Sequence, residues 1–435
     1  MSESGSDDDR ISRFIQPIGA VPTEPLTRRA LFGWGATGAA AIAASAWPAS
    51  AAAETERPEW MRAPGRPMSG YGAPSPREAA VRRGIQTRYG AIAPGSGAST
   101  TPLEGLEGTI TPSGLHFERH HSGIPDIDAA RFALLVDGNV ARPLFFSATD
   151  LLRYPLVSRT CFIECSGNSA PNIAPEVVQA PCGAVHGLLS CSEWTGVPLA
   201  LLLEEAGLRS TEGWLVAEGA DSSAMNRSIP LGLALEEGMV ALYQNGERIR
   251  PEQGYPMRLL LPGLEGNVNV KWLRRLEVRG EPAQARDETS KYTDLLPDGR
   301  ARQFTLEMGV KSVITRPSWG MRLPSSGFYE VSGLAWSGAG RIASVEFSAD
   351  GGRTWKTARL DGPVLPKALT RFRVPWQWKR GEAALLQSRA RDERGRVQPT
   401  RAAWTGNYAP KNTYHYNAIQ SWAIAPDGEV SNSHA

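Results

Sequence analysis

The stretch Arg159-Thr-Cys-Phe-Ile-Glu-Cys165-Ser-Gly-Asn168 joins an alternating run of residues to a small polar turn. From 157 to 165 every second residue falls on one face of an extended chain, which predicts a strand. The Ser-Gly-Asn sequence after Cys165 predicts a turn. A thiol at the end of a strand, beside a glycine that lets a ligand approach closely, suits a soft metal ion. The stretch therefore predicts a strand and turn that present a cysteine.

Cys165 has a second interpretation as a structural half-cystine, because the chain contains four cysteines. Cys161 is a poor partner for it. Four strand residues separate the two by about 13 Å, whereas a disulfide needs Cα atoms within about 7 Å of each other. Cys182 and Cys191 remain possible partners, so a disulfide and a metal thiolate are both open at this point.

The composition excludes several classes of protein. At 435 residues the chain is long enough for two or three domains. Its net charge of +2, without any basic run, argues against nucleic acid as a partner. The sequence has no Cys-x-x-Cys-His, so we expect no covalently bound haem in this chain. If the chain is a redox enzyme, its electron acceptor is expected on another chain.

Residues 1–53 resemble a twin-arginine signal peptide. Arg28 and Arg29 precede a weakly apolar, Gly- and Ala-rich stretch from 33 to 47, and the alanines at 49, 51 and 53 offer A-x-A cleavage sites. A transmembrane anchor is the alternative, but the apolar stretch is short and rich in glycine, so we expect no membrane span. The twin-arginine route exports folded proteins, which suits a cofactor inserted in the cytoplasm. We therefore expect a periplasmic protein.

The remaining chain predicts an α+β protein of two domains. Residues 54–114 are rich in Pro, Gly, Ser and Arg, which predicts an extended N-terminal arm or a disordered linker. Residues 115–300 predict a mixed α/β domain with strands at 131–138, 214–218, 257–261 and 272–278. Its clearest helix runs from 197 to 207, with Pro in the first turn and Gly at the end.

Short strands with turn signals over 301–420 predict an all-β, immunoglobulin-like sandwich. We expect one of its strands at 397–404 and a C-terminal tail at 421–435. The sandwich contains no cysteine, so large apolar side chains are expected to form its core. The candidates are Trp336, Phe347, Trp355 and Trp404.

Four segments, in this order, resemble the sulfite oxidase family of molybdopterin enzymes over about residues 115 to 410. The four are Phe117-Glu-Arg119-His120-His121, Glu164-Cys165-Ser-Gly-Asn168, Leu189-Ser-Cys-Ser-Glu-Trp194-Thr-Gly196-Val-Pro-Leu199, and Gly254-Tyr-Pro-Met-Arg258-Leu-Leu-Leu-Pro262-Gly263 with the following Val270-Lys271-Trp272-Leu273. The resemblance implies a molybdopterin-binding domain of sulfite oxidase type, followed by an immunoglobulin-like dimerisation domain. It also implies a molybdenum cofactor whose metal takes one thiolate from the protein.

The resemblance assigns that thiolate to Cys165 and implies catalytic positions for Arg119 and Tyr292. It implies cofactor binding by Arg119, His121, Cys165, Asp221, Arg258, Asn269 and Lys271. Guanidinium and ammonium groups suit the cofactor's phosphate because they form charge-assisted bonds to it. Asn269 occupies a position where many relatives carry His. Adjacent side chains of an extended chain point to opposite faces, so His120 and His121 are not expected to chelate one ion together.

Within that family, the chain is most similar to the molybdenum subunits of sulfane dehydrogenases, which act in the bacterial Sox system of thiosulfate oxidation. This implies oxidation of a persulfide on a sulfur-carrier protein, transfer of electrons to a c-type cytochrome subunit, and a dimer formed through the C-terminal domain. A sulfite dehydrogenase on the same scaffold is one alternative. A non-enzymatic, disulfide-bonded periplasmic binding protein is another.

The chain departs from the family beside Cys165. Relatives that oxidise sulfite usually have Cys-x-Gly-Asn-Arg-Arg, whereas this chain continues from Asn168 with Ser169-Ala170. Relatives use the second of these arginines to help bind the anionic substrate. One charge pair at 4 Å contributes about 4 kcal/mol at an effective dielectric of 20. Even heavily discounted, its loss predicts at least roughly tenfold weaker sulfite binding.

Overall fold

The computed structural model describes residues 59–86, 94–409 and 411–434. Contacts divide the chain into residues 1–73 and 74–435. The twin-arginine segment lies outside the described residues, and residues 59–73 contain one 3-10 turn, η1 (Glu59–Met61). No helix in the described part of the chain is both long and apolar enough to cross a bilayer.

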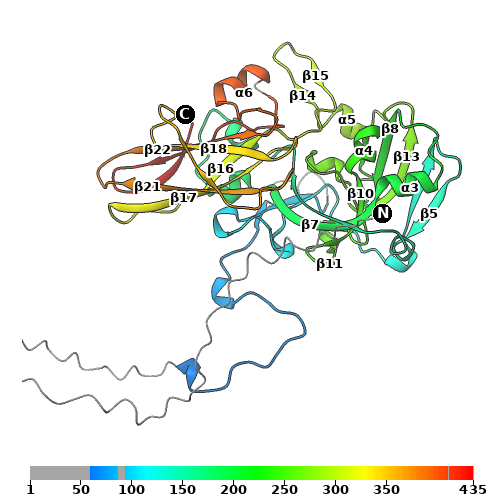
Figure 1. Ribbon diagram of the computed structural model, residues 1–435, viewed down its shortest axis with the longest axis horizontal. Coiled ribbons are helices and arrows are strands. Elements are labelled where there is room, and N and C mark those ends of the chain that lie inside the picture. The colour runs from blue at the N-terminus through cyan, green and yellow to red at the C-terminus, as the bar shows by residue number, and fades with distance from the viewer. Residues whose placement is uncertain (1–58, 87–93, 410, 435) are drawn as a thin grey trace, which may run out of the picture. The chain divides into compact units, whose positions relative to one another are not determined.

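Residues 74–435 hold two domains that lie side by side (Figure 1). The first contains two five-stranded sheets and a small three-stranded sheet. The three-stranded sheet consists of β1 (Gly84–Gln86), β2 (Gly97–Thr100) and β3 (Glu118–His120). One five-stranded sheet consists of β6 (Val157–Glu164), β7 (Leu189–Pro198), β10 (Met239–Gln244), β11 (Glu247–Arg248) and β12 (Arg258–Leu260). The other consists of β4 (Ala133–Gly138), β5 (Leu144–Ser147), β8 (Trp214–Gly219), β9 (Asn226–Pro230) and β13 (Leu273–Arg279).

Five short α-helices accompany these strands among the described residues of the first domain. They are α1 (Ala148–Leu151), α2 (Cys182–His186), α3 (Leu199–Glu205), α4 (Leu231–Glu237) and α5 (Arg286–Thr289). The helix predicted at 197–207 is α3, which begins after Pro198 and ends before Gly207, where φ is +74°. Leu199, Leu202 and Leu203 of α3 lie in one core with side chains of β4 and β8. The predicted strands of this domain are confirmed with small shifts of their bounds.

The strand predicted before Cys165 is β6. It pairs antiparallel with β7 over its whole length, from Val157 opposite Gly196 to Glu164 opposite Leu189. Pairing stops at Cys165, where the chain turns. The first domain therefore presents Cys165 at the end of a long and fully paired strand.

The second domain is a sandwich of two antiparallel sheets, as expected, and a small hairpin of β14 (Asp294–Leu295) and β15 (Ala301–Arg302) precedes it. One sheet consists of β16 (Lys311–Arg316), β17 (Gly327–Trp336), β20 (Arg359–Leu360) and β21 (Thr370–Trp378). The other consists of β18 (Ile342–Ser348), β19 (Lys356–Thr357), β22 (Ala384–Asp392), β23 (Ser421–Ile424) and β24 (Val430–Ser433). Trp336 and Phe347 are buried in its core, as expected. Trp355 is only partly buried.

Three boundary predictions are wrong. The second half of the expected strand at 397–404 is instead the start of helix α6 (Arg401–Asn407), which Thr400 caps by accepting the N–H of Ala403. Trp404 packs with Tyr416 in a separate cluster. The expected tail at 421–435 contains β23 and β24, which extend the sheet from β22. The expected arm at 54–114 contains β2, whose residues 98–100 are buried between β1 and β3, so its last part belongs to the first domain.

Candidate active site

One cavity of about 690 Å³, a volume that includes solvent at its mouth, gathers every residue expected at the site. Those residues are Arg119, His121, Cys165, Asp221, Arg258, Asn269, Lys271 and Tyr292. They come from the ends of β3, β6, β8 and β12 and from the segments before β13 and after α5.

Cys165 lines this cavity from the turn that follows β6. All four cysteines are free, and Cys165 is partly exposed whereas the other three are buried. The half-cystine interpretation is therefore wrong, and with it the disulfide-bonded binding protein. Burial raises the pKa of the Cys165 thiol, while the backbone N–H of Gly167 and the charge of Arg119 oppose this rise.

The backbone packs closely behind Cys165. The N–H of Asn168 donates to the Cys165 carbonyl at 2.8 Å. A Cβ added at Gly266 would lie 3.0 Å from the Glu164 carbonyl oxygen and 3.4 Å from the Cα of Cys165. A side chain at position 266 would therefore press against the backbone that carries Cys165.

Arg258 places a buried positive charge in the cavity wall. It is 3% exposed, and its guanidinium donates to the carbonyls of Gln253 at 3.0 Å and Asn269 at 2.8 Å. It lies over the ring of Trp194, with 5.0 Å between CZ and the ring centroid. Its Nε is buried without a hydrogen-bond partner among the described residues. Burial lowers the pKa of Arg258 to about 9.

Lys271 adds a second positive charge. Its Nζ lies 2.8 Å from His120 Nδ1, donates to the Glu252 carbonyl at 3.1 Å, and lies 4.4 Å from the centroid of the Trp272 ring. Burial, together with the charge of Arg258, lowers the pKa of Lys271 well below its usual value. Within the described ranges, neither Arg258 nor Lys271 forms an ion pair with a carboxylate. Two buried cations without a carboxylate favour an anionic ligand, because a buried charge is costly unless it is paired.

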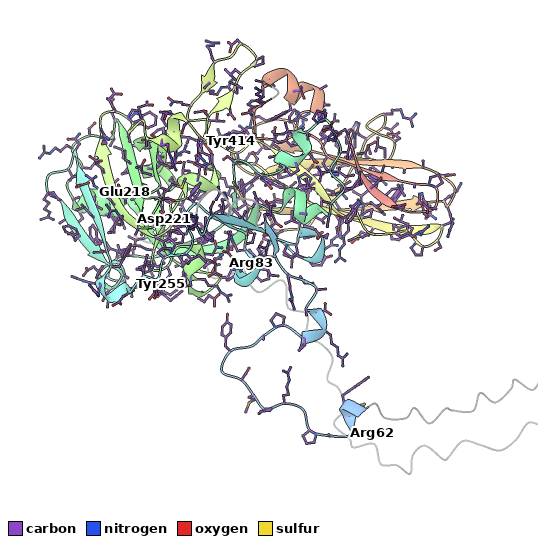
Figure 2. All side chains as sticks on the ribbon, turned by 180° about the vertical axis from the view of Figure 1, so that it is seen from behind. Arg62, Arg83, Glu218, Asp221, Tyr255 and Tyr414 are labelled. Atoms are coloured by element: carbon purple, nitrogen blue, oxygen red, sulfur yellow. The ribbon has the colours of Figure 1, made fainter. Side chains whose placement is uncertain are left out.

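Asp221 also lines the cavity, from the segment just after β8; Figure 2 labels it in the first domain. Its Oδ2 accepts the hydroxyl of Ser122 at 3.0 Å, and that hydroxyl in turn accepts the N–H of Ser223 at 3.1 Å. The carboxylate is therefore held in one orientation with acceptor capacity left for a ligand. Ser122 was not expected at the site, because a serine between a histidine and a glycine carries no distinctive pattern.

The side chain of Asn269 forms hydrogen bonds within the segment that carries it. Its Oδ1 accepts the N–H of Leu261 at 2.7 Å, and its Nδ2 donates to the Glu265 carbonyl at 2.9 Å. The side chain is thus used to fix the backbone of its own segment, while its carbonyl accepts from Arg258. Asn269 also lines the cavity, and cofactor binding by its side chain stays a prediction.

His121 and Tyr292 form a neutral pair at the cavity. Tyr292 OH lies 3.0 Å from His121 Nε2. Burial, and then the charge of Arg119, lowers the pKa of His121 to about 3; burial raises the pKa of Tyr292. His120 also lines the cavity, but its ring nitrogens face Glu118 at 2.7 Å and Lys271 at 2.8 Å, so it contacts other partners than His121 does. The described residues contain no group of three or more His, Cys, Asp or Glu side chains that could hold a metal ion.

The second domain supplies residues that sequence reasoning missed. The ring of Tyr414 lies 5.5 Å from that of Tyr292, and the N–H of His415 donates to the Ser166 carbonyl at 2.8 Å. Figure 2 shows Asp221 in the first domain and Tyr414 closer to the second. The sequence around Tyr414 and His415 has no pattern that predicts these contacts, because they form only where the two domains meet.

The two positions after Asn168 carry no charge toward the cavity. Ser169 is buried and its hydroxyl lies 2.6 Å from His186 Nδ1. Ala170 begins a 3-10 turn, η7 (Ala170–Ile173), and neither residue lines the cavity. The residues present fit an anionic cofactor that takes one thiolate: a partly exposed thiol, two buried cations and an oriented carboxylate converge on one space.

Comparisons with known proteins agree with this fit. Residues 121–286 match the oxidoreductase molybdopterin binding domain, and residues 302–422 match the Mo-co oxidoreductase dimerisation domain. Mitochondrial sulfite oxidase of Rattus norvegicus is 32% identical over 342 residues, which are 72% of this chain and 62% of that protein. An NADH nitrate reductase of Solanum lycopersicum is 29% identical over 351 residues, which are 70% of this chain and 38% of that protein.

A solved structure extends the likeness to nearly the whole described fold. The sulfane dehydrogenase SoxCD from Paracoccus pantotrophus contains a chain that is 45% identical, with a TM-score of 0.84. The match covers 88% of this chain and 98% of that one. The conserved fold, the matched domains and the thiol-bearing cavity together show that the chain belongs to the sulfite oxidase family of molybdenum oxidoreductases, with a molybdopterin cofactor.

Proposed function

We propose that this chain is the molybdenum subunit of a periplasmic enzyme that oxidises sulfane sulfur, carried as a persulfide on a protein cysteine, during thiosulfate oxidation. The observation that carries the proposal is the absence of a cation after Asn168. Ser169 is buried away from the cavity, and Ala170 has no charge to offer a small anion. A larger and less charged substrate is better suited to such a site. The likeness to a sulfane dehydrogenase supports the same substrate class.

In this proposal the chain's own residues hold the cofactor. Arg258 and Lys271 bind the cofactor's phosphate, since they are buried cations that need an anion. Asp221 accepts hydrogen bonds from the pterin, and Cys165 binds the metal as a thiolate. When bound, the cofactor accepts two electrons from the substrate sulfur and releases them one at a time.

Tyr292 and His121 orient the substrate. Both are uncharged near neutral pH, because His121 has a pKa of about 3 and the pKa of Tyr292 is raised. Their hydrogen bond fixes the phenol at the cavity, where it can donate to or accept from the persulfide without adding charge. Arg119 adds a positive charge on the same wall, to attract the terminal sulfur of a persulfide anion.

Electrons leave to a c-type cytochrome subunit in this proposal, and two copies of the chain associate through the second domain. The matched dimerisation domain supports the association. Export by the twin-arginine route, which places the enzyme in the periplasm, rests on Arg28 and Arg29.

Steady-state kinetics with sulfite test the substrate class. The purified holoenzyme, with a cytochrome c acceptor, should oxidise free sulfite slowly and with weak saturation. Molybdenum content should be measured on the same sample, so that a low rate cannot come from missing cofactor. Efficient oxidation of micromolar sulfite at full molybdenum content would overturn the proposal.

A sulfite dehydrogenase on the same scaffold is the second candidate. Arg119 in the cavity wall favours it, since one arginine remains to attract sulfite. The similarity to sulfite oxidases favours it too. The sulfite experiment separates the two candidates, because they predict opposite results at full molybdenum content.

A further inference from the structure

A buried ion pair lies directly behind the metal ligand and joins the two domains. Glu164 precedes Cys165 in the first domain, and Lys311 begins β16 of the second. Their side chains are 2% and 1% exposed, and Lys311 Nζ lies 3.2 Å from Glu164 Oε1. The Nε1 of Trp336, also from the second domain, donates to Glu164 Oε2 at 2.7 Å. The cavity is not lined by any of these three residues.

The pair holds both ends of the turn that carries Cys165. At the first end, Glu164 Oε1 also accepts a hydrogen bond from Asn168 Nδ2 at 2.9 Å, so the carboxylate links the residue before Cys165 to the last residue of the Ser-Gly-Asn turn. At the far end, Lys311 Nζ donates to the hydroxyl of Ser169 at 2.7 Å. Ser169 has a φ of +67°, a conformation that a non-glycine residue keeps only when its surroundings enforce it. One ammonium group therefore contacts the residue before the turn and the residue after it.

A contribution to folding stability does not by itself explain why Glu164 and Lys311 form a buried ion pair. Replacing a buried ion pair by apolar residues of similar volume is often neutral or stabilising, whereas removing one partner is strongly destabilising. Such a pair is better suited to fixing geometry than to adding stability. The geometry it contacts is that of the turn presenting Cys165.

We propose that Lys311, with Trp336, is a positioning residue through which the second domain sets the orientation of the Cys165 thiolate on the metal. The second domain contacts this turn at another point as well, through the N–H of His415 and the carbonyl of Ser166 at 2.8 Å. The inference concerns the metal ligand, so it holds whichever sulfur compound is oxidised. Groups that orient a metal ligand from behind commonly tune the metal's properties.

Cys165 offers a readout that needs no activity, because it is the partly exposed cysteine and the other three are buried. In the cofactor-free full chain, the rate of labelling by a thiol reagent such as DTNB reports how firmly the turn is held. Lys311→Met should raise this rate about tenfold, because the turn opens more often when its two contacts to Lys311 are lost. In the holoenzyme, the same variant should change the g values of the Mo(V) paramagnetic resonance signal.

Two further variants separate positioning from general stability. Arg371→Met removes another buried cation of the second domain, one that donates to the backbone of Gly108 and Leu106 and not to the Cys165 turn. It should lower the unfolding temperature without changing the labelling rate or the g values. Glu164→Gln with Lys311→Met removes both charges, so stability should recover while labelling stays fast.

The inference is overturned if Arg371→Met accelerates labelling as much as Lys311→Met does. It is also overturned if the double variant regains the wild-type labelling rate together with its stability. If Lys311→Met does not fold, Glu164→Gln, which keeps the shape of the side chain, is measured in its place. An unchanged rate and unchanged g values in that variant contradict the inference equally.

Discussion

Arg258→Met should loosen the cofactor while leaving the empty protein folded. The charge is 3% exposed, with two backbone carbonyls as acceptors and one Nε without a partner. A phosphate charge 4 Å away contributes about 4 kcal/mol at an effective dielectric of 20. Water in the cavity and the neighbouring charge of Lys271 reduce this electrostatic attraction, and halving it leaves about 2 kcal/mol. A loss of that size corresponds to roughly thirtyfold faster dissociation of the cofactor. Methionine keeps the apolar contact with Trp194.

The assay is a time course of molybdenum per chain during dialysis, measured by mass spectrometry, on protein from a host that makes the cofactor. The unfolding temperature of the cofactor-free variant should stay close to that of the wild type, because the substitution also removes a buried, unpaired charge. Arg274→Met is the control, since Arg274 is exposed on β13 and pairs with Glu218. The reasoning is refuted if Arg258→Met keeps its molybdenum as long as Arg274→Met does.

Three further outcomes are expected. Tyr292→Phe should lower kcat by roughly 10- to 100-fold at unchanged molybdenum content, because it removes the hydroxyl that bonds to His121; an unchanged kcat would show that the phenol has no part in turnover. Gly266→Ala should lower the unfolding free energy by about 1–3 kcal/mol and reduce molybdenum content, since its Cβ meets the Glu164 carbonyl at 3.0 Å; denaturant unfolding and metal analysis check this, and full values for both contradict it. The cofactor-free protein should lose stability as pH falls from 6.5 toward 3, because burial lowers the pKa of His116 to about 3 and that of His120 to about 2. In this pH range the unfolded chain binds protons at these histidines and the folded chain does not. The free energy of unfolding therefore falls by about 1 kcal/mol per histidine between pH 7 and 5.5. Urea midpoints that do not change over this range would contradict the prediction.

The local patterns around Cys165 were sufficient to predict its surroundings. Strand β6 and the turn after it follow from period-two alternation and a Ser-Gly-Asn sequence, both of which depend on a few neighbouring residues. Residues of the cavity wall such as Arg119, Arg258 and Lys271 were found by their family segments, and the cavity contains them all.

What the sequence did not predict depends on contacts between distant segments. The side chain of Asn269 fixes backbone groups of Leu261 and Glu265, so its part in the site is visible only once that loop is folded. Tyr414 and Lys311 reach the first domain across the domain junction, and no pattern in their own neighbourhoods indicates it. The same applies to β23, which was expected to be part of a C-terminal tail and instead pairs with β22.

We propose that the cavity is built for sulfane sulfur and not for sulfite. The most direct measurement offers both substrates to one preparation of holoenzyme, a persulfide on a small carrier protein and free sulfite, with the same cytochrome c acceptor. The account predicts a kcat/KM for the persulfide at least about tenfold above that for sulfite, because no cation follows Asn168. An equal or higher kcat/KM for sulfite would contradict it.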